Sequence, residues 1–161
     1  MTVYFLQFSK PDGQGKEVRG HSTDVKHPGW IELEAFSWGV TQSAGTGQTS
    51  GKEPSPAKLQ DFHLVTADGA AFSGIMFGCV NGTRFPTVTL EAGKEELIYL
   101  RVVLTDVFIS SCYTGGDRQG LPPTLQFSLN AVKVQWNYFD ASAGTPLPKA
   151  AAPPPRPPKT K

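Results

Sequence analysis

The chain has 161 residues, which is the size of a single domain. Hydrophobic residues make up 39% of it, which excludes collagen and disorder of the whole chain, and a body of this size can bury a core without disulfides. Only 18% of the residues are charged and the net charge is +1, so we expect no nucleic-acid partner, because general nucleic-acid binding depends on a strong positive field.

Proline and charge are distributed unevenly along the chain. Seven of the fourteen prolines lie between Pro146 and Pro158, and residues 141–161 carry four basic and no acidic side chains. Residues 1–140 therefore have a net charge of −3 and residues 141–161 a net charge of +4. We expect a mildly acidic folded body, residues 1–140, followed by a basic, flexible, proline-rich tail, residues 141–161, that favours polyproline II and does not join the core.

The N-terminal segment predicts a strand and no targeting signal. Val3–Phe8 is followed by the turn residues Pro11-Asp12-Gly13. No basic residues precede its apolar residues, as they do in a signal peptide, and no segment of the sequence reaches the 18 or more apolar residues of a membrane span. We therefore expect the protein to fold in the cytoplasm without stable membrane insertion.

The histidines and cysteines of the sequence form no recognisable metal-binding motif. His21 and His27 flank Asp24, but no Cys or third His lies near them to complete a metal site, so we expect exposed polar residues here. Cys79 and Cys112 lie in apolar settings, which favours free buried thiols in a reducing compartment; a disulfide between them stays an alternative. We expect no metal and no cofactor.

Two segments change the phase of their apolar alternation, which predicts bends in long strands. Ile31–Val40 changes phase near Glu34–Phe36, where we expect a β-bulge. Leu125–Tyr138 changes phase near Asn130–Ala131, with Val132 in the phase of the core residues that follow. Strands of this kind indicate a curled sheet, in a barrel or a sandwich.

The longest irregular stretch is Thr41–Lys58, which has no large apolar residue. Loops of this length in a compact domain are usually functional or disordered. The strand expected after it, Leu59–Val65, places His63 in the same phase as its two ends, so we expect a partly buried, hydrogen-bonded histidine.

One helix is expected after this strand, ending at Asn81-Gly82. Gly74 and Gly78 lie inside it and either weaken the helix or allow it to pack closely on a sheet. The apolar residues at helical spacing are Phe72, Ile75, Met76 and Cys79.

The segment Leu97–Ile109 is apolar in both phases of a strand, which indicates burial on both faces. Two explanations stay open. Either the strand crosses from one core layer to another, or its outer face is covered by another subunit.

No catalytic arrangement is recognisable in the sequence. Neither cysteine has a neighbouring base, Gly45-Thr46-Gly47 lacks the Lys-Ser/Thr of a phosphate-binding loop, and Glu32 and Glu34 share a strand face as solvent-exposed pairs do. We therefore expect a protein that is not an enzyme and has no catalytic residues.

The segment Ile31–Gln42, with its apolar-x-apolar-x-x-aromatic-Ser-Trp-Gly pattern, resembles a strand of the Hcp family, the haemolysin-coregulated tube proteins of bacterial type VI secretion systems. The resemblance extends over residues 3–138. It includes the Gly/Ser-rich loop, the single helix, a turn at Phe85-Pro86, a hairpin of Thr87–Ala92 with Glu96–Val107, and a last strand at Leu125–Tyr138.

The resemblance implies a mainly β fold: a small antiparallel β-barrel of two sheets with one flanking α-helix, assembling as a homo-hexameric ring. Rings stack into a tube inside a contractile sheath, beneath a spike protein, and leave the bacterial cytoplasm through the type VI apparatus with effector proteins in the lumen. It also implies that the loop contacts neighbouring subunits or rings. The candidate interface residues are Thr41, Gln42, Ser43, Thr46, Gln48, Thr49, Ser50, Lys52, Glu53 and Lys58.

A monomeric β-barrel that binds a carbohydrate or small ligand is the alternative function. Its stacking platforms would be Trp30, Trp38 and Trp136. The phase of Trp38 and Trp136 matches that of core residues, which argues against exposed stacking.

Overall fold

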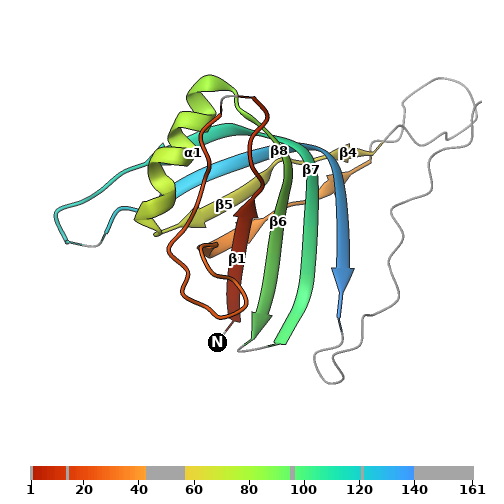
Figure 1. The fold of residues 1–161 in the computed structure, drawn as a ribbon, viewed down its shortest axis with the longest axis horizontal. Helices are drawn as coiled ribbons and strands as arrows, with labels where there is room; N and C mark the ends of the chain where they lie inside the picture. The colour runs from red at the N-terminus through yellow and green to blue at the C-terminus, as the bar shows by residue number, and fades with distance from the viewer. Residues whose placement is uncertain (1, 14, 43–56, 95–96, 121, 140–161) are drawn as a thin grey trace, which may run out of the picture.

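The computed structural model describes residues 2–13, 15–42, 57–94, 97–120 and 122–139. Six of its strands form a closed barrel in the order β1-β2-β5-β8-β7-β6, and β3 and β4 form a separate two-stranded sheet. Figure 1 shows α1 across one end of the barrel and β4 on the side away from α1. The elements are β1 (Thr2–Phe8), β2 (Ile31–Ser37), β3 (Val40–Thr41), β4 (Lys58–Leu59), β5 (Phe62–Thr66), α1 (Gly69–Asn81), β6 (Arg84–Lys94), β7 (Leu97–Thr114) and β8 (Leu125–Tyr138).

The barrel wall is antiparallel at every pairing, with β7 between β6 and β8 and with β1 between β2 and β6. Alternation along the strands turns apolar side chains inward, and the rings of Phe62, Phe85 and Phe127 are at most 2% exposed. Closure leaves the six barrel strands without a free edge. The expected mainly β barrel with one helix is confirmed; the second sheet is the small β3–β4 ribbon.

The bulge expected near Glu34–Phe36 is confirmed, because the register of β2 against β5 shifts between Leu33 and Ala35. In β8 the inward phase also changes, between Leu129 and Val134. However, the irregular backbone lies on the partner strand β7, at the register shift after Ile109 and at Asp106, whose φ is +57°.

The position of Val132 was predicted wrongly. It lies where the two strands change phase together, and its side chain is 72% exposed instead of facing the core. The same change explains much of the apolar pattern in β7: Leu104 points inward before Asp106, and Val107 points inward after it. This fits the first explanation, a strand that changes the face it buries.

The helix begins after Asp68, whose carboxylate accepts a hydrogen bond of 3.0 Å from the Ala70 N–H, and ends at Gly82, with φ of +61°. Its buried face is displaced from the expected one, since Phe72 is 38% exposed. The reason is close packing: a Cβ on Gly78 would lie 3.0 Å from Cδ1 of Ile109. The residues that face the barrel are Ala71, Gly74, Ile75 and Gly78, which supports the close-packing role of the glycines.

Two smaller predictions were also wrong. His63 is exposed, because Phe62 and Leu64 are the residues of β5 that point inward. The single strand that was expected is interrupted between Leu59 of β4 and Phe62 of β5. Phe85 and Pro86 form no turn but belong to β6, where Phe85 is fully buried.

Candidate assembly surface

The Gly/Ser-rich loop begins and ends on a short ribbon. In it, Val40 pairs with Leu59 and Thr41 pairs with Lys58. The N–H of Gln60 donates to the carbonyl of Gly39 at 2.8 Å, and the Gln60 side-chain amide donates to the Thr41 hydroxyl at 2.9 Å. These bonds hold β3 and β4 together.

The candidate interface residues lie partly on this ribbon. Thr41 and Lys58 are exposed on β3 and β4, and Gln42 is exposed directly after β3. The other seven candidates lie outside the described residues: Ser43, Thr46, Gln48, Thr49, Ser50, Lys52 and Glu53.

An apolar groove of about 490 Å³ lies at the base of the loop. Val40 and Val132 on it are 50% and 72% exposed. We call this surface the loop-base patch, made of Trp38, Val40, Leu59, Val132 and Trp136. Sequence reasoning missed it, because it placed Val132 among the core residues and looked for contacts only in the polar loop.

The tryptophans of the patch are anchored to the core. Trp38 stacks on Phe62 with ring centres 5.1 Å apart, and its ring centre lies 5.5 Å from that of Trp136. Trp30 contacts neither of them in this way; its ring lies against the ring of His27, with ring centres 4.8 Å apart. The three tryptophans therefore form no common platform on which a sugar could stack.

A second apolar surface lies on the outer side of α1. We call it the helix patch, made of Phe72, Phe77 and Val80, which are 38%, 44% and 81% exposed. Figure 1 places α1 and the β3–β4 ribbon on opposite sides of the barrel. The described residues thus include two exposed apolar surfaces of different composition.

The reactive side chains are poorly arranged for catalysis. Burial, and then the neighbouring Cys79, raise the pKa of the Cys112 thiol, which keeps it protonated and a weak nucleophile. Ser110 donates to Asp61 at 2.7 Å, but within the described residues no hydrogen bond joins a histidine to this pair. Nor do the described His, Cys, Asp and Glu side chains gather in threes to hold a metal.

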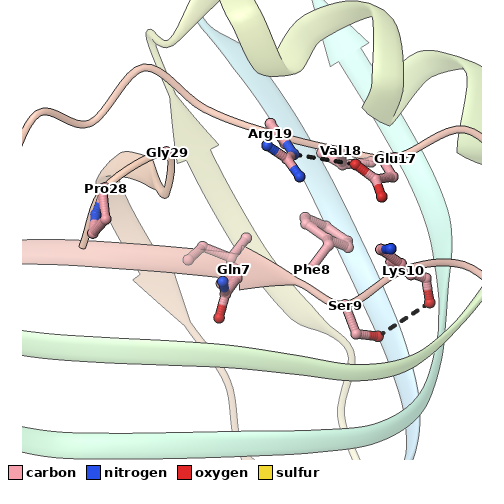
Figure 2. Close-up of a pocket in the computed structure, with 10 residues that line it drawn as sticks. Gln7, Phe8, Ser9, Lys10, Glu17, Val18, Arg19, Pro28 and Gly29 are labelled. Atoms are coloured by element: carbon pink, nitrogen blue, oxygen red, sulfur yellow. Dashed lines mark hydrogen bonds and ion pairs between the residues drawn. The ribbon is translucent and has the colours of Figure 1, made fainter. Parts of the chain in front are cut away.

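A further cleft of about 380 Å³ lies between β1 and the segment that follows it (Figure 2). Arg19 and Glu17 form an ion pair of 3.1 Å along the segment on one side of it, and Pro28 and Gly29 also line it. No nucleophile and base face each other among the described residues of this cleft. In the part of the chain that the structure describes, no helix is long and apolar enough to cross a bilayer.

Comparison with known proteins agrees with this fold. A family model described as "Type VI secretion system effector, Hcp" matches residues 5–138. Protein hcp1 of Pseudomonas aeruginosa is 29% identical over 126 residues, which cover 76% of this chain and 78% of that protein.

Solved structures show the same fold at lower sequence identity. One, described as a type six secretion system protein, has a TM-score of 0.77 at 24% identity and covers 94% of this chain and 93% of its own. Hcp1 from Salmonella typhimurium has a TM-score of 0.69 at 21% identity, covering 91% of this chain and 99% of its own. Since the family model spans most of the sequence, this chain belongs to the Hcp family of type VI secretion tube and effector proteins.

Proposed function

We propose that the protein is a structural subunit of the type VI inner tube, which forms stackable hexameric rings that are expelled and carry effector proteins in their lumen. The observation that supports this most is the presence of two different exposed apolar surfaces on a rigid, closed barrel. The fold itself is shared with Hcp proteins.

A closed ring needs two surfaces because its subunits meet head to tail. Such a contact joins one patch of a subunit to a different patch of the next. The helix patch lies on α1 and the loop-base patch lies around the β3–β4 ribbon and β8, so the two are different surfaces of the subunit. Exposed apolar side chains such as Val132 and Val80 are expected where a partner covers them.

Stacking of rings is assigned to the loop between β3 and β4. Its residues Thr41–Lys58 are mostly small and polar, so a contact between loops buries little apolar area. We expect such a contact to be weaker than the lateral one. A tube can then separate into rings after delivery.

The remaining assignments follow from the same proposal. Residues 1–140 form the tube domain, and residues 141–161 form an appendage that is not needed for assembly. The partners are sister subunits, the spike, the contractile sheath and effectors, with no nucleic acid and no stable membrane insertion. The protein moves from the bacterial cytoplasm to the outside through the apparatus, and it acts mechanically, without enzymatic activity.

The alternative, a monomeric ligand-binding barrel, has one feature in its favour. The loop-base groove is apolar and lined by Trp38 and Trp136. Light scattering coupled to size-exclusion chromatography separates the two functions. Rings correspond to six copies of the 17.3 kDa chain, about 104 kDa, and a ligand-binding monomer to a single copy.

A further inference from the structure

His27 is buried in the segment between β1 and β2, where an exposed histidine was expected. It is 3% exposed, its ring stacks on Phe5 with centres 4.3 Å apart, and the edge of Trp30 closes it off. Its Nδ1 lies 2.7 Å from Oδ2 of Asp24, and its Nε2 lies 2.6 Å from Oε2 of Glu91, on β6.

The two hydrogen bonds favour a charged ring. An ionised carboxylate only accepts hydrogen bonds, so each ring nitrogen must donate one, and only the imidazolium has a proton on both. Glu91 is itself 6% exposed, and its second oxygen accepts from Nε of Arg101 at 2.8 Å. Asp24, His27, Glu91 and Arg101 thus form an alternating row of charges that compensate one another, as buried ions require.

We propose that the His27 imidazolium is a proton-dependent clasp that holds the segment Asp24–Gly29 against the barrel wall and releases it when the ring loses a proton. The inference is independent of the proposed tube function.

The segment is held by hydrogen bonds within the stretch between β1 and β2 and by bonds to the barrel. His27 N–H donates to the Asp24 carbonyl at 3.1 Å within the segment, and Gly29 N–H donates to the carbonyl of Ser22, which precedes the segment, at 2.9 Å. The bond from His27 to Glu91 joins it to β6, across 64 positions of the sequence. A second anchor lies nearer the start, where His21 N–H donates to Asp68 at 2.7 Å.

The direction of the pH effect follows from the geometry. A neutral ring has one N–H, so its other nitrogen would turn a lone pair toward a carboxylate oxygen at hydrogen-bond distance, which is repulsive. The clasp is therefore closed at lower pH and opens as the pH rises. The pKa of Asp24 is lowered, foremost by the hydrogen bond from His27, so that this carboxylate stays ionised into the acid range.

Charged groups face the His27 ring from its own segment and from the barrel. Asp24 faces it from its own segment, Glu91 from β6, and Arg101 on β7 faces Glu91. Phe5 on β1 contributes no titrating group. Lys26 lies beside Asp24, to whose carboxylate its backbone N–H donates at 3.1 Å.

Opening would change a surface of the molecule. Pro28 and Gly29 directly follow His27 and form one wall of the cleft beside β1 (Figure 2). Val25, at the tip of the segment, is 95% exposed. Release of the segment would widen the cleft and free this tip.

The test is NMR of the full chain with ¹⁵N-labelled histidine, together with amide hydrogen exchange from pH 5 to pH 9, corrected for the intrinsic exchange rate. We expect both nitrogens of His27 to be protonated at pH 7, with the signal assigned by its loss in His27→Gln. Protection of the amides of Asp24–His27 and of Gly29 should fall about tenfold as the ring deprotonates, the effect of one charge-assisted hydrogen bond.

Two variants separate the clasp from a general effect of pH. In Glu91→Gln the amide N–H of the glutamine can donate to Nε2 of a neutral ring, and the amide oxygen can still accept from Arg101. The segment should therefore stay closed at high pH, with a single proton on the ring. His21→Gln removes the other histidine between β1 and β2, whose Nδ1 lies 3.3 Å from Oδ1 of Asp68. This variant should leave the pH transition of the segment Asp24–Gly29 unchanged.

The proposal is overturned if one ring nitrogen of His27 is unprotonated at pH 7, or if protection does not fall with rising pH. It is also overturned if Glu91→Gln shows the wild-type transition. If that variant does not fold, Asp24→Asn tests the same hydrogen bond at Nδ1 and should likewise keep the segment closed at high pH. The Asp24 side chain is 40% exposed, so its substitution should disturb the fold less.

Discussion

Replacement of Val132 by Asp tests the loop-base patch as a contact between subunits. Val132 is 72% exposed in the single chain, so its side chain contributes little to folding. In a ring in which a neighbour covers it, the same side chain would be buried. The substitution should therefore weaken assembly far more than it weakens the barrel.

The magnitude follows from this exposure. Full burial of a valine is worth roughly 1.5–3 kcal/mol, so covering the exposed part contributes about 1–2 kcal/mol to each contact. An Asp left there without a partner adds the cost of removing a charge from water. Each contact should lose a factor of ten or more in affinity, whereas the free energy of unfolding should change by about 1 kcal/mol or less, the range of strand propensity.

The assay is molar mass by light scattering over a dilution series, with urea unfolding as the measure of stability. Val25→Asp is the matched control, because Val25 is 95% exposed and lies away from the patch. We expect Val132→Asp to dissociate at concentrations at which wild type and control remain rings. An unchanged mass for Val132→Asp would refute the assignment, and equal dissociation of both variants would show a general effect of added charge.

Three further predictions concern the loop, the tail and a tight backbone contact. Deletion of Gly45–Gly51 should reduce tube formation seen by electron microscopy while ring mass persists; undiminished stacking would argue against the loop. Removal of residues 146–161 should leave ring mass and thermal unfolding as in wild type, and loss of rings would show that the tail takes part. Gly20→Ala should lower the free energy of unfolding in urea by about 1–3 kcal/mol, because the added Cβ would lie 2.3 Å from the carbonyl oxygen of Trp30. A Cβ at Gly39 would have no atom within 4 Å, so Gly39→Ala should leave the free energy of unfolding nearly unchanged. Equal stability of the two variants would contradict that contact.

Much of the fold was predictable because its signals are local. Alternation identified the strands, the phase change in β2 located the bulge near Ala35, and Asn81-Gly82 marked the end of α1. Where β8 differed, the cause was a distant part of the chain. Val132 is exposed because β7 changes phase opposite to it at Asp106, a residue 26 positions earlier.

The buried histidine and the helix patch were missed for different reasons. His27 occupies a polar segment, and its partner Glu91 lies 64 positions away, so no local pattern indicates its burial. The helix patch is exposed because Gly74 and Gly78 turn the small face of α1 toward the barrel, whereas apolar spacing alone would have turned Phe72 inward. Of the candidate interface residues, those in 43–56 stay predictions.

The central claim is that this barrel functions as a ring, and the molar mass of the wild-type chain in solution tests it most directly. We predict about 104 kDa at micromolar subunit concentration, six copies of the 17.3 kDa chain, with ring-shaped particles in negative stain. A mass of one chain under the same conditions, without rings, would contradict the account.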